Sequence, residues 1–146
     1  MLLAVGLLGL ATPPAQAEIP DEALREELRQ RLLEPPECLP QCAQIARMRL
    51  SAGETALQLR LEIHTQEAVA VPLPGQQDQW LAQAVTVDGA PAGGLRRDGS
   101  GGYWLDLPAG RHQVLLSGAL PQRESFQLPL PLPPHRVEVE ASGWSV

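Results

Sequence analysis

The chain lacks lysine and asparagine altogether and has only five aromatic side chains among its 146 residues. Without lysine it has no Walker-type phosphate-binding loop, and no glycine-rich dinucleotide fingerprint occurs either. The formal net charge of -6 provides no overall basic surface for nucleic acid or anionic lipid. An apolar content of 44%, with 13 Gly and 15 Pro, excludes a collagen, a coiled coil and a wholly disordered chain. The length predicts one globular domain with its own core.

The first 17 residues predict a signal peptide. They carry no charge, and an apolar run at residues 2–11 precedes Pro13 and Pro14. Ten apolar residues span about 15 Å as a helix, half the hydrocarbon core, which disfavours a transmembrane helix. Small residues before Glu18 fit a signal-peptidase site, so we expect cleavage between Ala17 and Glu18. No basic residue precedes the apolar run, which leaves an apolar N-terminal anchor or a buried segment as the alternative.

Residues 18–44 predict a short helix followed by a cysteine clip. Pro20 suits the first turn of a helix, and Asp21 beside it complements the positive end of the helix dipole. One apolar stripe and several oppositely charged pairs three or four positions apart continue the pattern: Leu24, Leu28, Leu32 and Leu33, with Glu22/Arg25, Glu26/Arg29 and Glu27/Arg31. We expect a surface helix packed by one edge on the domain. Docking on a partner or on a longer chain is the alternative.

The only two cysteines, Cys38 and Cys42, predict a local disulfide. In an exported chain an even pair four positions apart is most simply cross-linked. Redox catalysis prefers two cysteines separated by two residues in a βαβ unit, and this sequence has neither feature. A metal site would need further ligands that the neighbouring sequence does not supply. Free or intermolecular thiols, a redox pair and a metal site stay open as alternatives.

From residue 45 to residue 146 the sequence predicts an antiparallel β-sandwich, immunoglobulin-like or related. Leu57, Leu59 and Leu61 alternate with polar residues, as in a half-buried strand. The predicted strands are 46–50, 54–64, 68–73, 81–87, 103–107, 112–117, 125–130 and 136–141, with turns at 51–53, 74–75, 88–89, 98–102 and 108–110. Between residues 128 and 134 proline occupies alternate positions, which indicates an edge strand or a polyproline-like connector; a proline-rich recognition motif is the alternative.

Few residues predict catalysis. The glycine-rich run around Ser100 is expected to be a hairpin loop, because a serine nucleophile needs a histidine and an acid brought to it by the fold. Glu138 and Glu140 share one face of a strand, where solvated carboxylates are expected in place of a glycosidase pair. The histidines stand singly and without metal-ligand spacing: His64, His112 and His135. We therefore predict no catalytic residues, no cofactor and no metal.

The three tryptophans, Trp80, Trp104 and Trp144, are the candidate ligand-binding residues of this aromatic-poor chain. Exposed tryptophans can form a platform for carbohydrate. The competing interpretation, which we prefer, is that each covers part of the sandwich core.

Residues 27–42, which hold both cysteines, together with 69–75, 107–114 and 129–144, carry a resemblance to a known group of proteins. Along these segments the chain resembles the N-terminal, periplasm-facing region of large uncharacterised membrane proteins of gammaproteobacteria. The resemblance implies a longer protein with membrane-spanning segments further on, and it brings no activity and no catalytic residues.

We therefore expect an exported, non-catalytic interaction or structural module of a cell-envelope protein. It would be periplasmic or extracytoplasmic, held at the inner membrane through a C-terminal region that this sequence lacks, with a partner protein or the remainder of the longer chain as its partner. A carbohydrate-binding module using the tryptophans is the first alternative, and a periplasmic hydrolase is a remote one.

Overall fold

The computed structural model describes residues 21–33, 38 and 41–145. The chain divides into two compact units, one holding the helix and the other beginning at Cys38. The cysteine clip therefore belongs to the same unit as the strands. The predicted signal peptide and its cleavage site at Ala17 and Glu18 lie outside the described residues. Within the described part of the chain, no helix is long and apolar enough to cross a membrane.

Helix α1 (Glu22–Leu33) forms as predicted, and Asp21, expected in its first turn, precedes it as the capping residue. Asp21 Oδ1 accepts a hydrogen bond from the Leu24 N–H at 2.8 Å, which satisfies one of the free donors at the helix start. The charged pairs form at the predicted spacings: Glu22–Arg25 at 3.0 Å, Glu26–Arg29 at 3.7 Å and Glu27–Arg31 at 2.8 Å. No residue of α1 is buried, and its leucine stripe is exposed.

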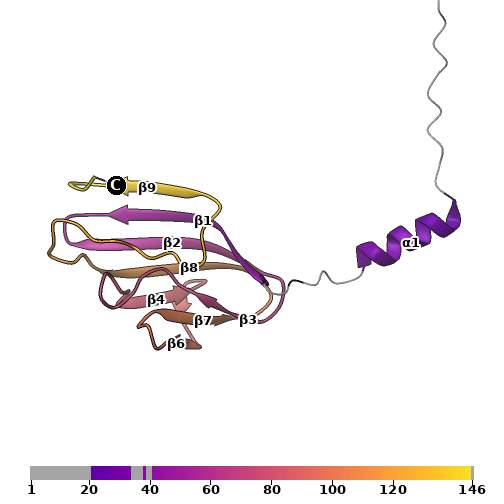
Figure 1. The fold of residues 1–146 in the computed structure, drawn as a ribbon, viewed down its shortest axis with the longest axis horizontal. Helices are drawn as coiled ribbons and strands as arrows, with labels where there is room; N and C mark the ends of the chain where they lie inside the picture. Colours follow the sequence, from indigo (N-terminus) through magenta and orange to yellow (C-terminus); the bar gives the residue numbers. More distant parts are fainter. Residues whose placement is uncertain (1–20, 34–37, 39–40, 146) are drawn as a thin grey trace, which may run out of the picture. The chain divides into compact units, whose positions relative to one another are not determined.

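The second unit is a two-layered β-structure, which confirms the mainly β fold. Its strands are β1 (Ala43–Ala52), β2 (Ala56–Thr65), β3 (Val69–Pro72), β4 (Ala84–Val87), β5 (Ala90–Pro91), β6 (Leu95–Arg97), β7 (Tyr103–Leu107), β8 (Gly110–Ala119) and β9 (Val137–Ala141). One sheet has the order β5-β4-β8-β2-β1-β9 and the other β3-β7-β6 (Figure 1). All pairs are antiparallel except β1 with β9, which are parallel.

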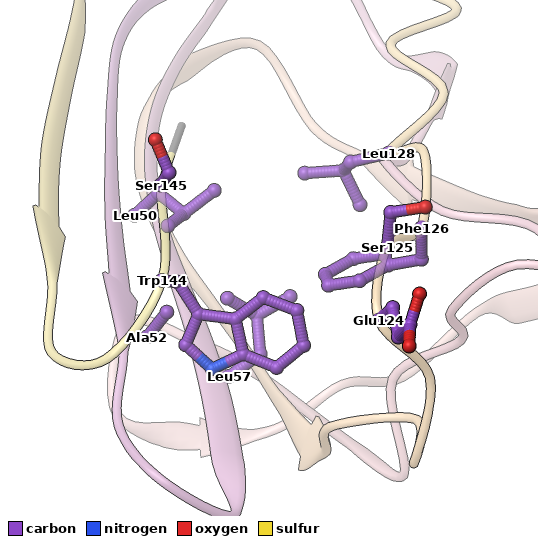
Figure 2. A pocket seen from close by; sticks show the side chains of 9 residues that line it. All are labelled: Leu50, Ala52, Leu57, Glu124, Ser125, Phe126, Leu128, Trp144 and Ser145. Atoms are coloured by element: carbon purple, nitrogen blue, oxygen red, sulfur yellow. The ribbon is translucent and has the colours of Figure 1, made fainter.

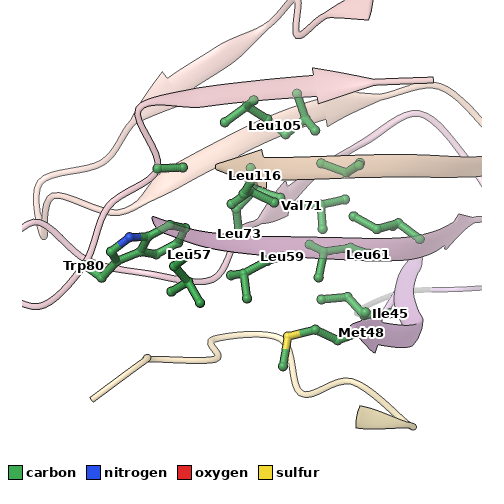
Figure 3. Packing of buried hydrophobic residues seen from close by; sticks show 14 of the residues in the cluster. Ile45, Met48, Leu57, Leu59, Leu61, Val71, Leu73, Trp80, Leu105 and Leu116 are labelled. Carbon is green, nitrogen blue, oxygen red and sulfur yellow. The ribbon is translucent and has the colours of Figure 1, made fainter. Parts of the chain in front are cut away.

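The core lies between the two sheets (Figure 3). The predicted inner face of β2 is fully buried, with Leu57, Leu59 and Leu61 at 0% exposure. Val71 and Leu105 of the smaller sheet pack into the same cluster. Period-two alternation thus identified the buried face of the central strand correctly, because successive side chains of a strand point to opposite faces.

Strand β1 departs from simple alternation. A β-bulge places Ile45 opposite Ile63 but Arg47 opposite Glu62, so that Ala46 is the extra residue. Because of this bulge, Ile45 and Met48 both face the core although they are three positions apart. The predicted turn at 51–53 also begins too early, since β1 continues through Ala52.

The predicted strand at 125–130 is wrong. This segment belongs to an irregular connection between β8 and β9, and we call residues 121–136 the proline-rich segment. It lies beside the smaller sheet, where the Gly75 N–H donates to Pro129 O at 3.0 Å, and four of its side chains pack against the core: Phe126, Leu128, Leu130 and Leu132. Prolines at alternate positions cannot donate to a ladder, so the segment covers the core without joining a sheet. Strands β5 and β6, too short to show a pattern, were not predicted.

Candidate functional site

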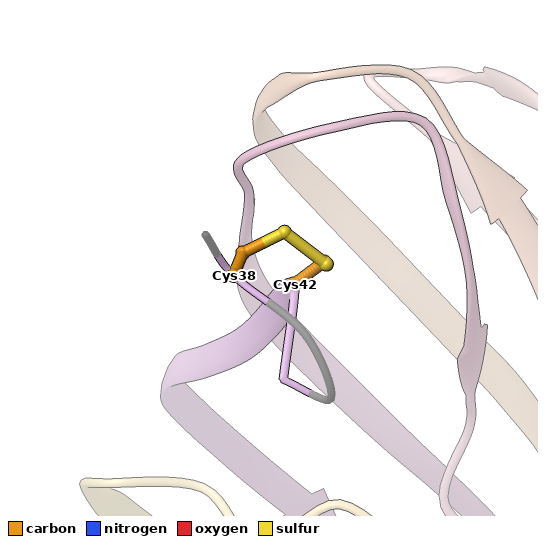
Figure 4. The surroundings of a disulfide bond; sticks show 2 residues. All are labelled: Cys38 and Cys42. Atoms are coloured by element: carbon orange, nitrogen blue, oxygen red, sulfur yellow. A yellow bond between two sulfur atoms is a disulfide. The ribbon is translucent and has the colours of Figure 1, made fainter. Parts of the chain in front are cut away.

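The cysteine clip is a disulfide, as predicted (Figure 4). Cys38 and Cys42 are joined, and the Gln66 N–H donates to Cys42 O at 2.9 Å, which ties the clip to the chain after β2. The carboxylate of Glu67 lies within 4.8 Å of both sulfurs. Sequence analysis missed Glu67 because it is 25 positions from Cys42. With the sulfurs bonded to each other, neither is a thiolate that could bind a metal.

The glycine-rich run is a closed hairpin loop. Asp98 Oδ1 accepts hydrogen bonds from Ser100 Oγ at 2.7 Å and from the Ser100 and Gly102 N–H groups at 2.9 Å each. Asp98 Oδ2 accepts one from Trp104 Nε1 at 2.9 Å. These bonds, that from Ser100 Oγ above all, lower the pKa of the Asp98 carboxyl to about 2. Ser100 thus donates to a carboxylate inside its own loop, and no hydrogen bond in the described structure joins it to a histidine.

The histidines do not gather into a set of metal-ligating side chains within the described residues. His112 is buried. Its Nδ1 lies 3.0 Å from Asp88 Oδ2, and its Nε2 lies 3.1 Å from Pro108 O. A backbone bond from Gln113, and then the bond to His112, lower the pKa of Asp88. His64 Nε2 lies 3.0 Å from Glu62 Oε1 on the outer face of the larger sheet. His135 lines the same depression as His64.

The tryptophans do not form one platform. Trp80 is 3% exposed, and its Nε1 donates to Ala119 O at 3.0 Å, so it is a core residue. Trp104 is 36% exposed on β7. Trp144 stacks edge-on against Phe126, with ring centroids 5.7 Å apart. The preferred interpretation as core covers holds for Trp80 and for Trp144, which is partly buried against the core cluster, whereas Trp104 is exposed.

An apolar hollow of about 230 Å³ lies between β1 and the proline-rich segment (Figure 2). Leu50 and Leu57 line it from the larger sheet, Leu128 and Phe126 line it from the segment, and the Trp144 ring lies across its lower part. Glu124, Ser125 and Ser145 are its polar lining residues. Sequence analysis singled out Trp144 but not its neighbours, since they come from four stretches of chain that only the fold brings together.

Strand β9 borders this hollow. Leu50 lies opposite Val139 in the parallel register of β1 and β9, so the two side chains share the inner face of the sheet. Val137 and Val139 are nevertheless 46% and 42% exposed. The second layer therefore does not extend over β9, and its inner face stays open.

The outer face of the same strand carries an ion-pair cluster. Glu138 Oε2 accepts hydrogen bonds from Arg49 Nε at 3.0 Å and Arg49 Nη2 at 2.8 Å, while Arg47 and Arg136 lie 3.9 and 3.5 Å from Glu138 Oε1. The Arg49 hydrogen bonds are the main cause of the lowered pKa of Glu138. Glu138 and Glu140 do not act as an equivalent pair, because the first is bound by arginines and the second makes no ion pair among the described residues.

No model of a known protein family matches the chain, and no curated protein is detectably similar to it. Function is therefore inferred from the residues and contacts themselves. The candidate functional site is the apolar hollow together with the open side of β9.

Proposed function

We propose that this chain is an exported, non-catalytic interaction module of a cell-envelope protein. The observation that carries the proposal is the apolar hollow beside β9, which leaves aromatic and aliphatic side chains accessible. Accessible apolar surface next to an uncovered strand is typical of a place where another chain binds.

The disulfide supports the extracytoplasmic location. Cys38 and Cys42 are cross-linked, and such bonds persist in oxidising compartments such as the periplasm. Export through the signal peptide of residues 1–17, and attachment to the inner membrane through further chain segments, complete the proposal.

The contacts of the acidic residues support a non-catalytic role. Asp98 is bound within its loop by Ser100 and Trp104, and Glu138 is bound by Arg49. Carboxylates that are held ionised by such partners are poorly suited to act as general acids or bases near neutral pH.

A carbohydrate-binding role is the second candidate, and it depends on Trp104. This half-exposed ring borders a depression of about 300 Å³ that also contains Gln76, Asp98 and Ser100. However, Gln76 donates to Ser100 O, and Asp98 accepts from Trp104, so these polar groups already have partners within the protein. A sugar would have to compete with these bonds.

The proposal is tested by producing the chain in a bacterium with a periplasm. We expect it in the periplasmic fraction, starting at Glu18, with a mass that shows no free thiol. A cytoplasmic chain that still begins at Met1 and has two free thiols would contradict export. On the same material, glycan-array binding that is lost in Trp104→Ala would favour the carbohydrate role, and hydrolysis of ester or glycoside substrates would contradict the non-catalytic one.

A further inference from the structure

We propose that the open edge of β9 binds a β-strand of a partner protein, and that this partner strand alternates apolar and basic residues. The inference rests on the proposed function as an interaction module and names the kind of partner it takes. Addition of a strand to a sheet edge is a general mode of peptide recognition, in which backbone hydrogen bonds provide affinity and alternate side chains provide specificity.

The backbone of β9 has hydrogen-bonding groups available on its outer edge. The Met48 N–H donates to Arg136 O, and the Ser142 N–H donates to Ala52 O, at the two ends of the pairing with β1. In a parallel pair, alternate residues direct both backbone groups to the same neighbour. The even-numbered residues of β9 therefore bond to β1, and the backbone groups of Val137, Val139 and Ala141 point away from it. Beyond β9 the larger sheet has no further strand among the described residues.

The other sheet edges in the described structure are protected by short length, proline or arginine, whereas the only charges on β9 are two glutamates on one face. Strand β5 has only two residues and ends at Pro91, and β6 has three and ends with two arginines. Strand β3 ends at Pro72 and is followed by a chain that bonds to the proline-rich segment. Short length, charge and proline are the usual means of preventing edge pairing. Strand β9 has five residues, Val-Glu-Val-Glu-Ala, with no proline, no bulge and no basic residue.

The inner face of β9 matches apolar side chains of the partner. A strand added at a spacing of about 4.8 Å would place every second side chain beside Val137 and Val139. Those side chains would cover the exposed valines. The apolar hollow is adjacent, since Leu50 both lines it and lies opposite Val139 (Figure 2). Its volume of about 230 Å³ leaves room for an aliphatic side chain against Trp144 and Phe126.

The outer face of β9 matches basic side chains. The neighbouring strand β1 already shows this alternation of apolar and basic residues, because it places Met48 and Leu50 opposite the valines and Arg49 opposite Glu138. Glu138 is occupied by Arg49, whereas Glu140 is exposed and makes no ion pair within the described residues. A basic residue in the partner strand would pair with Glu140.

A second copy of β9 fits this edge poorly. If two β9 strands paired antiparallel around a two-fold axis with Val139 opposite Val139, Glu138 of each would lie opposite Glu140 of the other. Directly opposed like charges destabilise a sheet pair. The charge pattern therefore favours a different chain with basic residues.

The test uses the exported full chain and a short fluorescent peptide of alternating valine and arginine. We expect the peptide to bind and to slow hydrogen exchange at the Val137 and Val139 amides. A peptide of alternating valine and glutamate should bind about tenfold more weakly, a difference of about 1.4 kcal/mol.

Two variants separate backbone pairing from charge. Val139→Pro removes an outward N–H that β1 does not use, and Glu140→Arg reverses the charge of the glutamate that makes no ion pair within the described residues; each should weaken peptide binding about tenfold. Glu67→Arg is the matched control, because it makes the same charge change at an exposed residue far along the chain and should leave binding unchanged. Exchange protection in β2 verifies that each variant is folded, and Glu140→Arg keeps the test valid should Val139→Pro fail to fold.

Equal binding by the wild type, Val139→Pro and Glu140→Arg, or protection at another edge, would overturn the inference. So would a dimer of the chain that Val139→Pro abolishes, since the occupant would then be a second copy. If the exported, disulfide-bonded chain does not bind the peptide at all, the strand site is wrong while the export proposal stands.

Discussion

The Trp104 indole N–H donates a hydrogen bond to Asp98 Oδ2 at 2.9 Å, joining strand β7 to the glycine-rich loop that precedes it. The other oxygen of the same carboxylate accepts from Ser100 and Gly102. One acidic side chain thereby organises the whole loop. This relationship gives the aspartate, the serine and the glycine N–H of the run a structural part in closing the loop.

Asp98→Asn should loosen this loop. The new side-chain amide at position 98 would turn its own N–H donor toward the Trp104 N–H or the loop N–H groups, so at least one bond would be lost. We therefore expect the Trp104 fluorescence to shift to longer wavelength and the melting temperature to fall. Because the folded pKa of Asp98, about 2, lies below the ordinary value of 3.8, its contribution to stability is complete above pH 3.8 and is lost as the pH falls through 2. NMR titration of the carboxyl measures this pKa. Asp78→Asn, at an exposed turn residue, is the control and should change neither the Trp104 fluorescence nor the melting temperature.

Removal of the disulfide should weaken the β-unit without unfolding it. Closing a loop of this size stabilises by about 2 kcal/mol in the chain-entropy description. A Cys38→Ser/Cys42→Ser variant should lose that amount in urea denaturation and keep its β circular dichroism spectrum. Reduction of the wild type should produce the same loss. Complete unfolding of the double variant would show that the clip is essential to the fold.

Gly75→Ala should be more destabilising than Gly89→Ala. Both glycines have positive φ, 102° and 85°, so alanine is strained at either position. At Gly75, however, a Cβ would lie 2.6 Å from Trp80 O, whereas nothing lies within 4 Å at Gly89. We expect a loss of about 1 kcal/mol at Gly89 and about 3 kcal/mol at Gly75 in chemical denaturation. Equal losses would mean that the chain near Trp80 relaxes freely.

Arg49→Ala should release β9 from β1. Arg49 holds Glu138 through two hydrogen bonds, and its loss should speed hydrogen exchange at the even-numbered amides of β9. Arg60 is the matched control, because it lies directly opposite Arg49 and makes no ion pair among the described residues. Arg60→Ala should leave β9 protected, and equal exchange in the two variants would contradict the assigned role of the ion pair.

The same ion pair predicts a pH dependence of β9. The folded pKa of Glu138 lies below its ordinary value of 4.5, so the pair stabilises above that pH and is lost on acidification through the folded value. The protection factors of the β9 amides, which correct for the slower intrinsic exchange in acid, should therefore fall on acidification in the wild type. They should change less with pH in Arg49→Ala, where the pair is already absent.

Local features of the fold were predictable from the sequence. The three ion pairs of α1 depend on spacing along one helix, and the buried face of β2 depends on alternation along one strand. The turn at Asp88 and Gly89 was likewise predicted, and both residues adopt positive φ. The disulfide follows from two cysteines within reach of each other.

Predictions failed where distant segments compete. The apolar run at 125–130 resembles a strand, but it leads into prolines at alternate positions that cannot complete a ladder, and its leucines pack on the core as part of an irregular segment. The bulge at Ala46 also escaped prediction, because its cause is the register with β2.

By itself, the sequence determined the short-range structure: which charged residues pair along a helix, which face of a strand is apolar, and which cysteines join. Only the tertiary structure decided that β9 lies parallel to β1 at an open edge, that Trp80 is buried while Trp104 is exposed, and that Trp144 and Phe126 meet over a hollow. The physical reason is that side-chain periodicity reports burial along one element. The pairing of elements depends instead on packing and backbone hydrogen bonds between segments far apart in the chain.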